Sequence, residues 1–392
     1  MLGNTNNGSF CGLSDRGVDF VKMIEQEKSL SMLDKIKNKQ LLKFMEKSGF
    51  FCDSKNVKIQ SAYLHVTNKC NLKCVGCYSY DETRNAEEDL DFSEMKNIIN
   101  KLKVMGVDIL VISGGEPLIR KDLSDIVKYA KCDAEIKQVI VLSNGLFLTE
   151  QRALELCNYI DEFSISIDCY NENCVSYIRR ENRYQDIIKA IEIAKKYFKR
   201  VNILPTLHRN NIENVEDYIN LAKKLGVSIS FSILTCGVNS ETSDFIPTRS
   251  QLEYLGNTFK PGEQLTIRSK HDIEFSMTAC KKCGIAEETI SIASNGKVYP
   301  CHMCHDEKLV LGNICKDSTE QILIKRDFII KGVDVDNIEV CKDCKYRYLC
   351  GAGCRARAYM YDSLFSPDPY CPMFKKYLQS FEEFLINNYK DK

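Results

Sequence analysis

From Ser61 onward, the sequence alternates between strand-like and helix-like segments, and this alternation constrains the fold more than any other feature. The strand candidates are short runs rich in Val, Ile and Leu, at residues 61–67, 108–113, 138–143, 162–168, 200–207 and 228–234. Segments with helical periodicity lie between them, at residues 93–105, 121–132, 149–160, 185–198 and 213–225. Repeated βα units form parallel sheets with right-handed crossovers, and apolar strands suit burial on both faces. The sequence therefore predicts an α/β fold.

Three cysteines follow the first strand candidate with the spacing CxxxCxxC, namely Cys70, Cys74 and Cys77. A [4Fe-4S] cluster normally takes four cysteine thiolates, so three would hold it and leave one iron open. A zinc site or a set of buried thiols is the alternative interpretation. Structural zinc needs a fourth ligand, and no His or Cys occurs within thirty residues after Cys77. The spacing therefore favours an iron-sulfur cluster.

The segment Gly114-Gly115-Glu116-Pro117 follows the second strand candidate. Ligands of parallel α/β folds bind at the carboxyl ends of the strands, and glycine allows a ligand to approach the main chain. The CxxxCxxC motif and this segment together resemble the signature of the radical S-adenosylmethionine (SAM) enzymes. The resemblance implies a partial (β/α)6 TIM-type barrel with a wide mouth. It also implies that Cys70, Cys74 and Cys77 form the catalytic cluster loop, whose open iron is chelated by SAM.

The resemblance further assigns contacts with SAM. Glu116 is expected to face the methionine amino group, Ser166 and Asp168 the ribose hydroxyls, and Arg179 the carboxylate, for which a guanidinium fork is suited. A solvated helix face is the alternative for Arg179, and a simple turn is the alternative for Ser143 and Asn144. The expected contacts are Tyr78, Gly114, Gly115, Glu116, Pro117, Ser143, Asn144, Ser166, Asp168, Arg179 and Leu234.

One residue departs from the family pattern. Gly76 stands directly before the third cysteine, where the family often has an aromatic residue. Cluster ligation does not depend on that position. The packing of the loop against adenine does, and Tyr78 is expected to contribute through its backbone.

A field of cysteines begins after about residue 275, where the βα alternation stops. The chain has 20 cysteines and no export signal, so metal binding is a better interpretation than disulfides. Seven of them follow the pattern C-x12-G-x4-C, CxxC-x5-C-x3-C and a final C, which resembles the SPASM domain with its auxiliary iron-sulfur clusters. A zinc ribbon is the alternative. The resemblance assigns Cys341, Cys344, Cys350 and Cys371 to one cluster, and Cys283, Cys301 and Cys354 to the other, with Cys280 as fourth ligand and Cys304 as its competitor.

The first 55 residues carry no cysteine cluster. Their apolar spacing predicts two short amphipathic helices that run into a strand at Ser48-Gly49-Phe50-Phe51. This unit, helical or winged-helix, weakly resembles domains that recognise a leader peptide by strand addition. A helical cap is the alternative. The predicted units are therefore 1–55, a barrel at 56–270 and a SPASM-like domain at 271–392.

Charge and hydropathy exclude several classes of function. Lys plus Arg and Asp plus Glu both total 54, which indicates neither nucleic-acid binding nor an anionic membrane surface. No apolar run is long enough to span a bilayer, and the polar start lacks the regions of a signal peptide. We expect a cytoplasmic protein without a membrane partner.

The resemblance implies a radical oxidoreductase with SAM and three [4Fe-4S] clusters as cofactors. It would cleave SAM to a 5'-deoxyadenosyl radical and oxidatively modify a ribosomally made peptide, for example by thioether or other crosslink formation. A leader-bearing peptide and a one-electron reductant such as flavodoxin or ferredoxin are the expected partners. Three alternatives remain: formylglycine formation as in sulfatase maturases, which have an acidic residue where His302 stands; a small-molecule substrate; and a non-catalytic electron carrier, which has no use for Gly114–Pro117 or Ser166.

Overall fold

The computed structural model describes residues 2–5, 8–26, 32–48, 50, 58–80, 82–86, 88–235, 240–259 and 279–389. The predicted unit boundaries near residues 55 and 270 lie outside these ranges. Within the described part of the chain, no helix is both long and apolar enough to cross a membrane.

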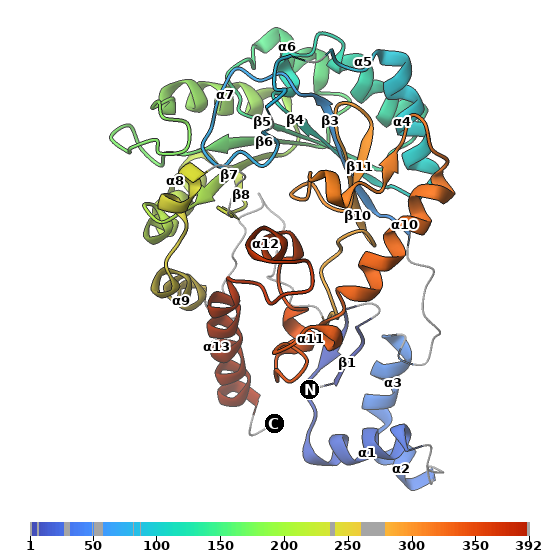
Figure 1. Ribbon diagram of the computed structural model, residues 1–392. Helices are drawn as coiled ribbons and strands as arrows, with labels where there is room; N and C mark the ends of the chain where they lie inside the picture. Colours follow the sequence, from blue (N-terminus) through green and yellow to red (C-terminus); the bar gives the residue numbers. More distant parts are fainter. Residues whose placement is uncertain are drawn as a thin grey trace.

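The centre of the molecule is a sheet whose parallel strands lie side by side in chain order, which confirms the predicted α/β fold (Figure 1). The predicted sixth strand is divided, because Ser228 pairs with Asn202 and Ser232 pairs with Thr206 in two separate short ladders on β7. The parallel strands are β3 (Ser61–Thr67), β4 (Ile109–Gly114), β5 (Gln138–Ser143), β6 (Glu162–Ile167), β7 (Val201–Leu207), β8 (Ser228–Ile229) and β9 (Ser232–Ile233).

Helices cover one side of this sheet, as the periodicity predicts (Figure 1). The first begins with a capping box, in which Asp91 Oδ1 accepts from Glu94 N and Glu94 Oε2 accepts from Asp91 N. Its apolar stripe, which includes Ile98 and Leu102, is fully buried against the sheet. The helices are α4 (Phe92–Val104), α5 (Leu123–Lys128), which continues as a π-turn (Tyr129–Asp133), α6 (Glu150–Leu156), α7 (Tyr184–Tyr197) and α8 (Val215–Leu225).

Three further strands extend the sheet beyond β3, and the sequence analysis did not anticipate them. β10 (Thr289–Ile292) pairs in parallel with β3, with Ser291 opposite Tyr63. β11 (Lys297–Tyr299) and β12 (Gly312–Asn313) continue it in antiparallel fashion. This pairing matters for function, because Cys301 follows β11 directly and is thereby carried toward the barrel.

The rest of the C-terminal region is helical. Helix α13 (Cys371–Tyr389) packs against α9 (Arg249–Thr258) so closely that a Cβ on Gly256 would lie 2.4 Å from the Met373 carbonyl oxygen. The other helices are α10 (Thr319–Gly332), α11 (Arg347–Cys350) and α12 (Arg355–Tyr361), and 3-10 turns span Pro117–Ile119, Ile212–Asn214, Ser240–Phe245, Glu307–Leu309 and Val335–Asn337.

The N-terminal region begins with a hairpin of β1 (Leu2–Gly3) and β2 (Phe10–Cys11), followed by α1 (Asp15–Glu25), α2 (Met32–Lys37) and α3 (Lys39–Lys47). The strand expected after Ser48 lies mostly outside the described residues, and Phe50 is in a turn. The hairpin contacts the C-terminal region, because Ala279 N donates to Gly8 O (2.9 Å) and the rings of Phe10 and Phe381 meet edge to face.

Candidate active site

A cavity of about 390 Å³ lies at the carboxyl ends of the parallel strands. Its wall contains Cys70, Cys74 and Cys77 and every expected SAM contact except Pro117. Pro117 is instead buried at the start of a 3-10 turn. The expected contacts that line the cavity are Tyr78, Gly114, Gly115, Glu116, Ser143, Asn144, Ser166, Asp168, Arg179 and Leu234.

The cysteine loop is held by side chains that follow it in sequence. Cys70 N donates to Asn85 Oδ1 (2.8 Å). Arg84 Nη2 donates to Ser79 O (2.7 Å), while its Nη1 lies 3.7 Å from Cys77 Sγ. Burial raises the pKa of Cys74 to about 12, so the thiol stays protonated unless a metal replaces the proton. Arg84 was not predicted as a site residue, because an arginine in a polar loop carries no distinguishing pattern.

Gly76 is glycine for a reason that the structure makes plain. Its φ is +67°, and a Cβ there would lie 2.6 Å from Leu234 Cδ1. The loop thus packs directly onto the end of the sixth strand region, where the family's aromatic residue would not fit in this backbone conformation.

Gly114, the last residue of β4, and Gly115, which follows it, allow the cysteine loop to cross this strand end. A Cβ on Gly114, whose φ is +123°, would lie 2.3 Å from Thr67 O. A Cβ on Gly115 would lie 2.1 Å from Lys69 O. Their first role is therefore close backbone contact between β4 and the segment that leads to Cys70, and both also line the cavity.

Glu116 is buried and already has three hydrogen-bond donors. Its Oε1 accepts from Leu118 N (3.0 Å) and Ser143 Oγ (2.8 Å), and its Oε2 accepts from Asn144 N (2.8 Å). Burial raises the pKa of this carboxyl above its ordinary value. Glu116 thus fixes the turn after β5, and its expected contact with an amino group stays a prediction.

Arg179 is 7% exposed and lies in a turn, so the alternative of a solvated helix face is wrong. Its Nη2 donates to Ser166 O (2.6 Å), and its Nε lies 3.5 Å from Asp168 Oδ1. Its Nη1 is buried and has no hydrogen-bond partner among the described residues. Because a buried unpaired guanidinium N–H is costly, this cavity is suited to an anionic group. Asp168 also accepts from Ser176 Oγ (2.9 Å). This bond helps to hold the carboxylate of Asp168 in the position where it orients Arg179.

Aromatic side chains from distant segments complete the wall. The rings of Tyr63 and His302 stack with centroids 4.1 Å apart, and His302 meets Tyr78 edge to face. Met303 and Met360 line the same cavity. Apart from Tyr78, none of these residues was predicted from the sequence to belong to the site. Only Tyr63 had a sequence signal, namely the alternation of residues along β3, the strand that precedes the cysteine loop.

The C-terminal cysteines form two groups. In the first, the charges of Cys283, Cys301 and Cys354 raise the pKa of Cys304, after the larger effects of its hydrogen bond with Cys301 and its burial. In the second, burial, together with the charges of Cys371 and Cys341, raises the pKa of Cys350 to about 12. The charge of Cys344 likewise raises the pKa of Cys341 and that of Cys371. Among the described residues, no group of three or more His, Cys, Asp or Glu side chains is arranged to hold a single metal ion.

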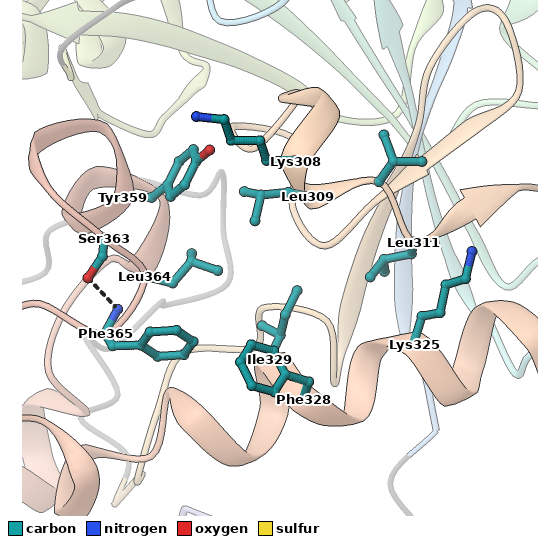
Figure 2. A pocket seen from close by; sticks show the side chains of 11 residues that line it. Lys308, Leu309, Leu311, Lys325, Phe328, Ile329, Tyr359, Ser363, Leu364 and Phe365 are labelled. Carbon is teal, nitrogen blue, oxygen red and sulfur yellow. Dashed lines mark hydrogen bonds between the residues drawn. The ribbon is translucent and has the colours of Figure 1, made fainter.

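A second hollow of about 270 Å³ lies outside the barrel, between α10 and the segment after α12 (Figure 2). Phe328 and Phe365 meet edge to face there, and Lys308 and Lys325 stand at its rim. None of the predicted site residues lines it.

The donor set fits the cofactors that the motifs imply. Three thiols face the cavity at the end of β3, an unpaired guanidinium N–H is buried in its wall, and Gly114 and Gly115 line it without a side chain. Thiolates are the ligands of iron-sulfur clusters, and a guanidinium pairs with a carboxylate.

Comparison with known proteins agrees with this chemistry. The profile of the Radical SAM superfamily matches residues 64–222, and the profile of the SPASM iron-sulfur cluster-binding domain matches residues 268–345. Mycofactocin maturase MftC of Mycolicibacterium smegmatis is 26% identical over 78% of this chain and 81% of its own. AdoMet-dependent heme synthase of Methanosarcina barkeri is 28% identical over 78% of this chain and 94% of its own.

Solved structures share the fold. The structure titled native anSMEcpe with bound AdoMet aligns with a TM-score of 0.64 at 20% identity, over 84% of this chain and 98% of that one. Streptococcus suis SuiB bound to precursor peptide SuiA aligns with a TM-score of 0.58 at 15% identity, over 90% and 88%. SAM and iron-sulfur clusters are therefore the cofactors of this chain. It is a radical SAM enzyme, and it belongs to the radical SAM superfamily with a C-terminal SPASM domain.

Proposed function

We propose that this enzyme is a maturase that oxidatively modifies a ribosomally made peptide. The observation that carries the proposal is that one cavity is lined both by the three-cysteine loop and by His302 and Met303, which follow Cys301. A substrate in this cavity meets both the site of radical formation and a residue next to an auxiliary cluster ligand. A relative named as a mycofactocin maturase and fold neighbours with bound peptide support the same substrate class.

The chain's own residues position the reactants. Cys70, Cys74 and Cys77 would hold the cluster and Arg179 would bind SAM, and these cofactors would supply radical chemistry that removes a hydrogen atom from the substrate. Arg179 offers its unpaired Nη1 to the SAM carboxylate, and Ser166 offers a hydroxyl to the ribose. Arg84 donates toward Cys77 Sγ and disperses the charge of that thiolate. The walls of the cavity shield the reacting carbon from water.

Auxiliary clusters are suited to an oxidative product. Formation of a thioether removes two hydrogen atoms from the peptide. One leaves as an atom with 5'-deoxyadenosine, and the other leaves as a proton and an electron, which needs an acceptor. We assign that acceptor to the C-terminal cysteine groups, which brings the total to three [4Fe-4S] clusters. A flavodoxin or ferredoxin would supply the electron that starts the reaction.

A small-molecule substrate is the second candidate, because the heme synthase relative aligns over 94% of its length. One experiment separates the two. The reconstituted enzyme is incubated with SAM, a reductant and a candidate precursor, such as a short cysteine-rich peptide found encoded beside its gene, and the products are analysed by mass spectrometry. We expect a peptide that is lighter by two hydrogen atoms and an equal amount of 5'-deoxyadenosine. An unmodified peptide, together with turnover of a tetrapyrrole, would replace the proposal with the second candidate.

Residues 1–55 are assigned to leader recognition in this proposal. Strand addition draws its affinity from main-chain hydrogen bonds and a few apolar pockets, so deletion of these residues should weaken peptide binding strongly. SAM cleavage without peptide should not change, because the barrel begins with β3. Isothermal titration of the peptide against full-length and truncated enzyme measures the difference. Equal affinities would make this region a cap, consistent with its contact to Ala279.

A further inference from the structure

Cys301 and Cys304 are the two ends of a tight turn. Cys304 N donates to Cys301 O (3.0 Å), and the two thiols are hydrogen-bonded to each other. Cys304 is 1% exposed and is part of the main core. Cys283, Cys301 and Cys354 pack against that same core. The charges of Cys283, Cys301 and Cys354 all act on Cys304, so four thiols from three separate segments lie near one another.

Cys280 lies elsewhere, although it precedes Cys283 by only three residues. Its main-chain N donates to Tyr348 O (2.7 Å), which ties it to α11. Its Sγ is 2.8 Å from the position that a Cβ on Gly351 would occupy. Gly351 directly follows Cys350, a member of the other cysteine group. The glycine, with φ of +56°, leaves room for the Cys280 thiol beside that group.

Spacing alone does not distinguish the two candidates, because both pairs have two residues between their cysteines. The pairs Cys74 with Cys77 and Cys341 with Cys344 have this spacing as well. A CxxC turn is therefore compatible with two corners of one cluster. Position in the fold decides between them.

We propose that Cys304, and not Cys280, is the fourth ligand of the first auxiliary cluster. The proposal takes the other three ligands, Cys283, Cys301 and Cys354, from the resemblance to the SPASM domain. Four protein thiolates close this cluster, so it exchanges electrons and does not bind a substrate thiolate. His302 and Met303 lie between two of its ligands and line the active-site cavity. An electron that passes from a substrate in the cavity to this cluster then has only the turn from Cys301 to Cys304 between the two. Cys280 is left as an unligated thiol beside the second cluster.

Iron content after anaerobic reconstitution tests the assignment without any substrate. Wild type should carry about twelve irons for three clusters. Cys304→Ala should fall to about eight or show the EPR signal of a three-iron cluster, whereas Cys280→Ala should keep about twelve. Cys315→Ala is the matched control, because Cys315 lies in the same region and outside both groups. Full iron in Cys304→Ala, or loss of iron in Cys280→Ala, would overturn the proposal.

A serine variant keeps the test decisive if Cys304→Ala does not fold. Serine retains an oxygen donor, so Cys304→Ser should hold the cluster with a shifted EPR signal, while Cys280→Ser should match wild type. An unchanged spectrum for Cys304→Ser would contradict the assignment. Neither readout involves a peptide, so a wrong substrate class leaves this result unaffected. SAM cleavage by the barrel cluster serves as the check on folding in every variant.

Discussion

Asp368 connects the two cysteine groups, and its replacement by asparagine gives the sharpest test of how the C-terminal region is held together. The residue is 3% exposed. Its Oδ2 accepts from Cys354 N (2.7 Å), and its main-chain O accepts from Cys371 N (3.0 Å). Arg357 Nε and Nη2 each donate to one carboxylate oxygen at 2.7 Å. Asp368 therefore contacts a ligand of each proposed auxiliary cluster, Cys354 through its carboxylate and Cys371 through its main chain.

The magnitude follows from the charge that Asp368→Asn leaves behind. The Arg357 side chain is 8% exposed, and removal of one partner from a buried ion pair costs about 3–5 kcal/mol. Asparagine also has one acceptor oxygen where aspartate has two, so one main-chain donor loses its partner at a cost of about 1 kcal/mol. The two costs together come to about 4–6 kcal/mol, so with 1.4 kcal/mol for each factor of ten, local opening should become roughly a thousandfold to ten-thousandfold more frequent.

Hydrogen-deuterium exchange of the amides between Gly351 and Cys371 measures this opening directly. Asp327→Asn, an exposed carboxylate on α10, is the matched control and should exchange like wild type. Replacing Arg357 by Met together with Asp368→Asn should cost less than the sum of the single changes, because neither charge is then left alone. Wild-type exchange in Asp368→Asn, or strict additivity in the double variant, would refute the reasoning.

Three further predictions concern the barrel. Gly76→Ala should weaken SAM binding more than tenfold. Gly226→Ala is the control, because Gly226 has nearly the same φ (+66° against +67°) but open space around it, so this change should leave binding unchanged and cost only the left-handed strain of about 1–2 kcal/mol. Equilibrium dialysis measures the binding, and thermal unfolding measures the stability of both variants. Arg179→Lys should lose about 10–100-fold in SAM affinity, measured by the same dialysis. The matched change at an exposed arginine, Arg183→Lys, should lose none. Equal SAM affinities of the two variants would contradict a contact between Arg179 and the SAM carboxylate. Burial lowers the pKa of His208 to about 4, so as the pH falls below about 6.5 the unfolded chain binds a proton at this residue and the folded chain does not. The free energy of unfolding should therefore fall by up to about 1.4 kcal/mol per pH unit. Urea unfolding between pH 7 and pH 5 measures this loss, which should disappear in His208→Gln.

The parts of the fold that depend on local pattern could be predicted from the sequence. The six strand regions and the cysteine loop were expected because apolar runs, helical spacing and ligand spacing are all encoded within a few neighbouring residues. The division of the sixth strand was missed, since both halves, around Ser228 and Ser232, have the same apolar alternation and only the contact with β7 separates them.

Long-range contacts account for the remaining misses. The pairing of β10 with β3 joins segments far apart in the sequence, and a four-residue strand carries no signal for its partner. As a result, His302 and Tyr63 were not expected to stack. The position of Cys280 beside Gly351 depends in the same way on the turn after α11, because the spacing to Cys283 equals that from Cys301 to Cys304.

We propose that Cys70, Cys74 and Cys77 hold the cluster at which SAM is cleaved. The most direct measurement replaces all three by alanine and compares iron content and 5'-deoxyadenosine formation after anaerobic reconstitution. The variant should carry about eight irons against about twelve in wild type and should form no 5'-deoxyadenosine with SAM and a reductant. Equal iron in the two proteins, or cleavage of SAM by the variant, would contradict the account.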